Sequence, residues 1–171
     1  MNRYLLTFTG ADRPGLIAAI ARELANLGAD IEDVSMTRLS GNFALMFLAR
    51  GCDRTQLETH LSALADRLGL RCHIDDAVED HGSVAPNLFV SAVGPNRVGI
   101  VATIAETLAA HGVNILEMTT HLIEETEVPI YLVRLEGRGD CDIVALEEDL
   151  AAAAGRIGVD VRVERIESEE L

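Results

Sequence analysis

Residues 10–31 read GADRPGLIAAIARELANLGADI, and residues 94–115 read GPNRVGIVATIAETLAAHGVNI. When residues 7–36 are laid over residues 91–120, ten of the thirty positions are identical, and most of the others are conservative pairs. Self-similarity at a fixed offset of this length is the mark of an internal repeat. The chain is therefore predicted to contain one domain twice.

The stretch EDHGSVAPN at residues 79–87 separates the two copies, since it is acidic, then small, then proline, with no apolar periodicity. Such composition is typical of a linker. We expect a first domain over 1–78, a linker over 79–86, a second domain over 87–168 and a tail over 169–171.

Each copy shows the same order of predicted elements, β-α-β-β-α-β. In the first copy the strand RYLLTFTG leads to a helix that Gly28 ends, and a strand over 30–39, the turn SGN and the run FALMFLA form a hairpin signal. The apolar stripe of that helix consists of Leu16, Ile17, Ile20, Leu24 and Leu27. The fold class is α+β, with two ferredoxin-like βαββαβ domains, each a four-stranded antiparallel sheet with two helices on one face.

The run FALMFLA, residues 43–49, is apolar at both alternating sets of positions. A sheet with helices on one face should show one polar set. Either the linker partly covers a strand in the middle of the sheet, or this face contacts another domain or subunit.

The charge of the chain argues against nucleic acid as a direct partner. It has 28 acidic and 14 basic residues, a formal net charge of -14, and six aromatic residues with no tryptophan, so phosphates would be repelled at long range. No run of eighteen apolar residues occurs, and the N-terminus is polar too soon for a signal peptide. We expect a cytoplasmic protein that does not contact a membrane.

No catalytic or metal-binding pattern is present. Cys52, Cys72 and Cys141 lack C-x-x-C spacing, and Cys72 and His73 are neighbours on a predicted strand, so they point to opposite faces. The five histidines fall on helices, strands or the linker, and no Ser-His-Asp or Cys-His arrangement is seen. We expect no enzyme, no metal and no cofactor.

The loop GADRPG has three interpretations. The first is a phosphate- or nucleotide-binding loop, but the stretch lacks the Lys-Ser/Thr of a phosphate loop and the three glycines of a dinucleotide fingerprint. It could simply turn the chain, with Asp12 capping the helix and Pro14 in its first turn. It could also bind a free amino acid, whose carboxylate suits a helix N-terminus, with Asp30 or Asn114 presented at the same end of the sheet.

Both repeated stretches resemble the ACT domain, a βαββαβ regulatory module that senses amino acids and other small molecules. The resemblance covers nearly the whole chain, twice, and two ACT copies at this length are most similar to the family of the glycine cleavage system transcriptional repressor. In ACT domains effectors sit at the interface between two domains, at the loop after the first strand and the start of the second. The resemblance therefore implies a free amino acid as effector, with glycine or serine as first choices.

Asparagine often binds the amino acid at both of those places. Carried over, the resemblance implies a ligand site in the second copy at Gly94, Asn96, Arg97, Gly99, Asn114 and Ile115. The corresponding positions of the first copy are Gly10, Asp12, Arg13, Gly15, Asp30 and Ile31. The two aspartates depart from the pattern, and since asparagine both donates and accepts, the second copy suits a zwitterion better.

The leading hypothesis is a non-catalytic regulator that forms a homodimer, in which a bound amino acid changes a contact with a regulatory protein partner. The related repressor acts through a DNA-binding activator protein, so the resemblance implies control of transcription without direct DNA contact. The alternative is a dimerisation or assembly module without a ligand.

Overall fold

The computed structural model of the chain describes residues 2–78, 84–125 and 127–166. The chain divides into two compact units, Met1–His81 and Gly82–Leu171, and each is described by itself. Residues 79–83 of the predicted linker and the predicted tail, 169–171, lie outside the described residues.

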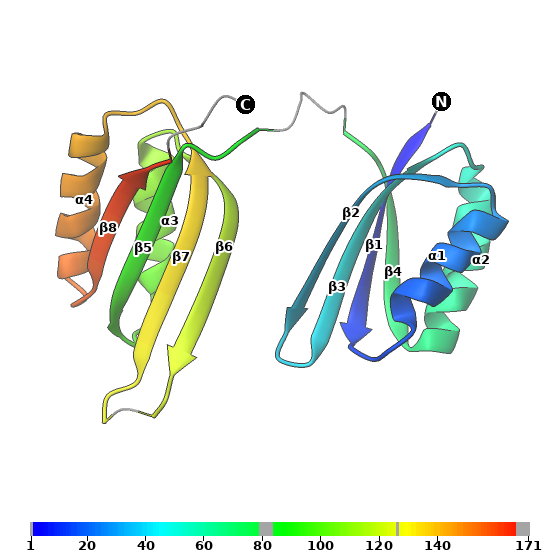
Figure 1. Cartoon of the computed structure of the whole chain (residues 1–171), viewed down its shortest axis with the longest axis horizontal. Coiled ribbons are helices and arrows are strands. Elements are labelled where there is room, and N and C mark those ends of the chain that lie inside the picture. Colours follow the sequence, from blue (N-terminus) through cyan, green and yellow to red (C-terminus); the bar gives the residue numbers. More distant parts are fainter. Residues whose placement is uncertain (1, 79–83, 126, 167–171) are drawn as a thin grey trace. The chain divides into compact units, whose positions relative to one another are not determined.

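The first unit contains two helices and four strands in the predicted order (Figure 1). They are β1 (Arg3–Ala11), α1 (Leu16–Asn26), β2 (Asp30–Leu39), β3 (Asn42–Arg50), α2 (Arg54–Leu68) and β4 (Leu70–Asp76). All neighbouring strands are antiparallel, in the order β2-β3-β1-β4.

The second unit repeats this arrangement element by element, with the sheet order β6-β7-β5-β8. Its elements are β5 (Leu88–Pro95), α3 (Ile100–Ala110), β6 (Asn114–Ile123), β7 (Ile130–Arg138), α4 (Ile143–Gly155) and β8 (Asp160–Arg165). The predicted fold class is confirmed: the chain carries two ferredoxin-like units, and in each of them both helices cover one face of an antiparallel sheet.

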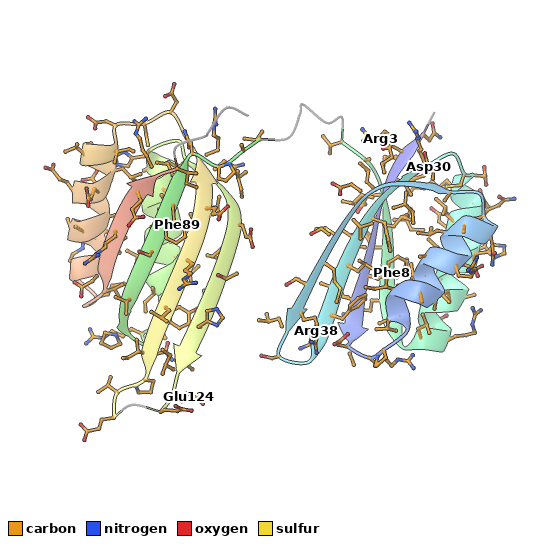
Figure 2. The ribbon with its side chains drawn as sticks, viewed as in Figure 1. Arg3, Phe8, Asp30, Arg38, Phe89 and Glu124 are labelled. Atoms are coloured by element: carbon orange, nitrogen blue, oxygen red, sulfur yellow. The ribbon has the colours of Figure 1, made fainter. Side chains whose placement is uncertain are left out.

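The core of the first unit lies between its sheet and its helices. Leu16, Ile20 and Leu24 of α1 are buried, as the helical spacing predicts, whereas Ile17 is 42% exposed. From the sheet, Phe8 (labelled in Figure 2) meets Phe47 edge to face with ring centroids 6.4 Å apart. Aromatic burial of this kind is the largest apolar contribution that a small unit can make.

The hairpin between β2 and β3 turns at Ser40 and Gly41, whose φ angles are 48° and 77°. Two consecutive residues with positive φ make the tight turn that joins twisted antiparallel strands. The turn SGN predicted from the sequence is confirmed.

The face of β3 that points away from the helices carries Ala44, Met46 and Leu48, and Met46 is 43% exposed. Within the described residues of the first unit, no helix and no second sheet covers this face. Whether the linker or another domain or subunit contacts these apolar side chains stays a prediction.

The outer strands β2 and β6 are exposed along nearly their whole length. Each has a register shift against its partner, between Ile31 and Asp33 in one and between Ile115 and Glu117 in the other. An edge strand offers unpaired backbone groups to another strand. Among the described residues, no helix is both long and apolar enough to cross a membrane.

Candidate functional site

The repeated loops connect β1 to α1 and β5 to α3, and each ends on a glycine in a left-handed conformation. Gly15 has φ 93° and Gly99 has φ 97°, and each occupies the N-cap position of its helix. Neither glycine has a side chain that could accept a hydrogen bond from the N–H groups of the first turn, and no other side chain of the described residues accepts from them. The first-turn N–H groups of α1 and α3 therefore have no anionic or polar side chain of the described chain on them.

The second helix of each unit begins differently. The carboxylate of Asp53 accepts from the N–H of Gln56 at the start of α2, and the carboxylate of Asp142 accepts from the N–H of Val144 at the start of α4. Both helices thus have the usual aspartate cap. The contrast recurs in both units, so the helix ends at the repeated loops are the ones left open.

Asp12 does not cap α1, so the interpretation that gave it this role is wrong. Its carboxylate forms an ion pair with Arg38 near the end of β2, and its N–H donates to the carbonyl of Gly41 at 2.9 Å. The end of β2 lies beside the loop, so Arg38 pairs with the Asp12 carboxylate. The carboxylate does not accept from an N–H group of α1.

Gly10 and Gly94 lie in closely packed places, and at Gly94 the close neighbours include backbone atoms. A Cβ atom on Gly10 would lie 2.6 Å from Cδ2 of Leu70, and one on Gly94 would lie 2.8 Å from the carbonyl oxygen of Gly158. Here the end of the first strand of the unit meets the turn before its last strand. Both glycines therefore recur for a structural reason.

The repeated arginine also contacts that turn. In the first unit Arg13 donates from Nη2 to the carbonyl of Leu68 at 2.7 Å, at the C-terminal end of α2, where a cation is favourable. In the second unit the Arg97 guanidinium lies over Gly158, since a Cβ there would be 3.8 Å from Cζ of the arginine. The arginine thus fixes the loop, which the sequence did not reveal.

In the first unit the loop borders a hollow of about 460 Å³. The hollow is lined by residues 12–15, by the first turn of α1 over 16–18, and by Met36 and Phe43. It combines open helix N–H groups with an apolar wall, the pairing that suits a small molecule with a charged head and an apolar remainder.

Asp30 and Asn114 do not lie at the same end of the sheet as the loops, so that prediction is wrong. Asp30 pairs with Arg50, which pairs in turn with Arg3, at the end where β1 begins (Figure 2). Asn114 pairs with Arg138, whereas Asn96 donates its N–H to Pro129, eight to nine residues away along β7. At about 3.3 Å per residue this separates the two asparagines by roughly 25 to 30 Å within one unit.

The polar side chains of the two copies also differ in whether another side chain of the protein is bonded to them. Oδ2 of Asp30 lies 3.0 Å from Nη2 of Arg50, so both aspartates of the first copy are neutralised by arginines. The exposed side chains of Asn96 and Asn114 make no hydrogen bond to any part of the chain that the structure describes. No side chain of the described chain is bonded to these two amides, whereas arginines pair with Asp12 and Asp30.

Ile31 and Ile115 pack partly buried against the cores of their units. Their contacts are with the core, so their ligand contact remains a prediction. The sequence did not suggest Arg38 as the partner of Asp12, because the two residues are 26 positions apart. A basic residue on an exposed edge strand, opposite an acidic loop, was the feature that could have indicated this ion pair.

Cys72 and His73 point to opposite faces, as expected. Burial on the helix side raises the pKa of the Cys72 thiol to about 11, and the His73 side chain is 75% exposed. Within the described ranges no group of three or more His, Cys, Asp or Glu residues could hold a metal ion.

In each unit one histidine connects the two helices. His60 Nδ1 of α2 lies 3.0 Å from Oε1 of Glu23 in α1, and His111 Nε2, just after α3, lies 2.9 Å from Oδ2 of Asp149 in α4. These pairs lie on the helical layer and do not reach the loops.

In a comparison with known families, one family model matches the chain twice, once in each unit. A family model described as the ACT domain matches residues 2–75 and again residues 87–164. A UPF0237 protein of Lactococcus lactis is 32% identical over 76 residues, which are 43% of this chain and 87% of the relative. A UPF0237 protein of Methanopyrus kandleri is 38% identical over 68 residues, 40% of this chain and 72% of the relative.

Solved structures also match over both units, among them two with a TM-score of 0.74. A protein of unknown function from Galdieria sulphuraria has a TM-score of 0.74 at 21% identity, covering 96% of this chain and 98% of its own. A candidate glycine cleavage system transcriptional repressor has a TM-score of 0.74 at 18% identity, covering 98% of each chain. At these identities the likeness is one of fold.

Proposed function

Because the chain belongs to the ACT-domain family, we propose that it is a non-catalytic regulator that binds a free amino acid at the loop before α3. The observation that carries the proposal is the open N-terminus of α3 at Gly99, preceded by the available side chain of Asn96. The helix end receives the carboxylate of the ligand. The amide oxygen of an asparagine accepts from its ammonium group.

Asn114 joins this site only if a second unit supplies it, since one small ligand cannot span about 25 Å within a unit. Antiparallel pairing of two β6 edges by a two-fold axis would bring Asn114 of one copy opposite the Ile123 end of the other. Ile123 pairs with Ile130, which pairs with Pro95, next to Asn96. A homodimer through β6 would thus complete two equal sites.

Complementation between two variants tests this site. Asn96→Ala and Asn114→Ala should each abolish amino-acid binding in calorimetry, with glycine and serine as the first ligands. When the two variants are mixed and exchanged, each mixed dimer regains one intact site, so about a quarter of the sites should return if subunits pair at random. Unchanged affinity in the single variants would place the site elsewhere, and no recovery on mixing would contradict the shared site.

A thermal-shift screen of the twenty amino acids decides between this sensor and an assembly module without a ligand. A ligand at 100 times its Kd adds about 2.7 kcal/mol to the free energy of unfolding. If none of the twenty raises the melting temperature, the assembly module is the better reading of the exposed edges.

The regulatory output we propose is control of transcription of amino-acid or one-carbon metabolism through a protein partner in the cytoplasm. The net charge of -14 supports a protein intermediary over direct DNA contact. The fold shared with the candidate glycine cleavage repressor suggests which genes to examine first. Deleting the gene should change transcripts of glycine cleavage enzymes, and the change should depend on added glycine; unaltered transcripts would contradict this output.

A further inference from the structure

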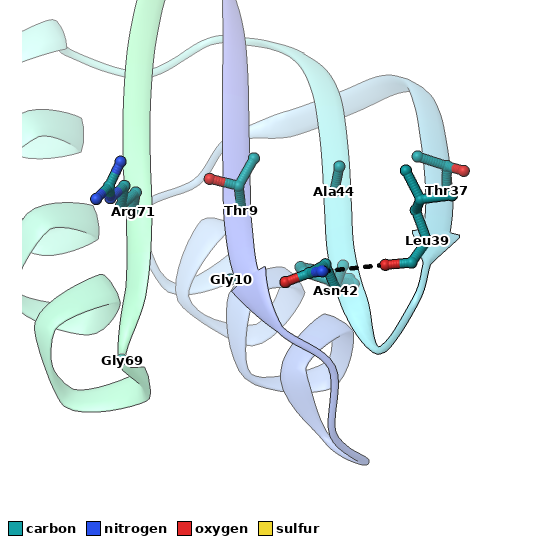
Figure 3. Close-up of a pocket in the computed structure, with 9 residues that line it drawn as sticks. Thr9, Gly10, Thr37, Leu39, Asn42, Ala44, Gly69 and Arg71 are labelled. Carbon is teal, nitrogen blue, oxygen red and sulfur yellow. Dashed lines mark hydrogen bonds between the residues drawn. The ribbon is translucent and has the colours of Figure 1, made fainter. Parts of the chain in front are cut away.

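A row of side chains crosses the face of the first sheet that α1 and α2 leave uncovered. Thr9 of β1 lies between Arg71 of β4 and Ala44 of β3, and Ala44 lies beside Thr37 of β2. Figure 3 shows these four side chains next to one another, on the same side of the sheet. They line a hollow of about 440 Å³ that also reaches Asn42.

The next row on this face has the same character. It consists of His73, Thr7, Met46 and Ser35. Together the two rows present four hydroxyl groups, an arginine and a histidine over an apolar centre, without a carboxylate. Carboxylates begin only in the third row, where Oδ1 of Asp75 lies 3.2 Å from Nε2 of His73.

Four of the eight arginines of the first unit are neutralised by carboxylates, and Arg71 is not among them. Arg3, Arg38, Arg50 and Arg54 form ion pairs with carboxylates. Arg71 is exposed, and within the described ranges it has neither a hydrogen bond nor an ion pair. A guanidinium without a partner in a chain of net charge -14, beside the Thr9 hydroxyl, presents the donors that an oxyanion accepts.

We propose that this face of the first unit binds a small organic anion, with a phosphate or carboxylate group at Arg71 and Thr9. Its apolar part rests on Ala44, and a second polar group reaches Thr37. Adjacent strands are about 4.8 Å apart, so Thr37 lies roughly 14 Å from Arg71 across three spacings. The ligand is therefore longer than a bare phosphate ion. The proposal uses none of the loop residues of the amino-acid site and does not depend on it.

The second unit provides an internal comparison. In its sheet the corresponding row reads Asp160, Val93, Leu132 and His121. A carboxylate stands where Arg71 stands in the first unit, and a valine stands in place of Thr9. In this row an anion is favoured in the first unit. One row further on the same face of the second unit, Arg162 and Arg134 flank Ser91, so binding to each unit is judged from the amide signals of that unit.

Binding of inorganic phosphate and of acetate to the full chain, at ionic strength held constant with sodium chloride, tests the proposal by NMR titration. The wild type should saturate with at least one of the two anions, and the preferred one tells a phosphate ligand from a carboxylate ligand. Arg71→Gln should weaken that binding at least tenfold, and Thr9→Val, which keeps charge and shape, should weaken it less. Arg67→Gln makes the same charge change on the exposed side of α2 and should leave the affinity unchanged.

Lack of saturation with both anions, or equal affinity in Arg71→Gln and Arg67→Gln, would overturn the proposal. Asn96→Ala should bind the anion as the wild type does. Failure of the amino-acid site and failure of this site are therefore seen separately.

Discussion

Single residues explain why Gly, Arg and Gly recur in the two loops. Gly10 and Gly94 allow two strands to approach, and Gly15 and Gly99 adopt a positive φ that other residues rarely reach. The shared fold gives a structural reason for their recurrence. What separates the copies chemically is Asp12, held by Arg38, against Asn96, whose side chain is available.

The buried thiol of Cys72 gives a pH-dependent prediction. Burial raises its pKa from 9.0 to about 11, so between these pH values the unfolded chain loses this proton while the folded chain keeps it. The contribution of the neutral thiol to stability is complete below pH 9 and is lost as pH rises toward 11. Cys72→Ala should therefore show a flatter decline of the unfolding free energy over pH 9 to 11.

Alkylation with iodoacetamide at pH 8 measures the same shift directly. Because the thiolate is the reacting form, Cys72 should react about 100-fold more slowly in the folded protein than in urea. Equal rates in the two states would show that the thiol is not shielded.

At the scale of elements, apolar periodicity was sufficient to predict the helices, the hairpin and the sheet. Leu57, Leu61 and Leu64 of α2 are buried as their spacing requires. The predicted position of Asp30 beside the loop was wrong because α1 runs antiparallel to β1. The helix returns the chain to the end of the sheet where β1 began, so β2 starts far from the loop. The separation of Asp12 from Asp30 follows from that topology, whereas the capture of Asp12 by Arg38 depends on side-chain geometry that spacing does not give.

The aspartate cap of α2 gives the prediction at this scale. Asp53→Ala removes the acceptor of the Gln56 N–H and should lower the free energy of unfolding of the first unit by about 1 kcal/mol. Asp53→Asn keeps an acceptor oxygen in place and should cost much less. Urea denaturation followed by circular dichroism measures both, and equal losses would assign the effect to charge.

In the whole molecule, the two apolar cores share no residue. One core is built from residues of the first unit and the other from residues of the second. A core substitution in one unit should therefore lower the stability of that unit only. The other unit then serves as an internal reference in the same sample.

Phe47→Ala tests this independence. Phe47 is 2% exposed, so truncation should cost the first unit about 3 to 5 kcal/mol. NMR amide signals of the second unit should keep their chemical shifts and their urea midpoint. Met46→Ala, one position away and 43% exposed, should cost far less. Loss of both units at one midpoint in Phe47→Ala would mean that they unfold together.

The open ends of α1 and α3 have a further consequence for the regulator proposed here. In α2 and α4 the capping carboxylate belongs to the chain and is always present. In α3 the carboxylate would belong to the bound amino acid, so the first-turn N–H groups find an acceptor only when that amino acid is abundant. Each tenfold rise of an amino acid above its Kd then adds about 1.4 kcal/mol to the stability of that unit. Resistance to unfolding and to proteolysis would itself report the concentration of the nutrient, before any partner is involved.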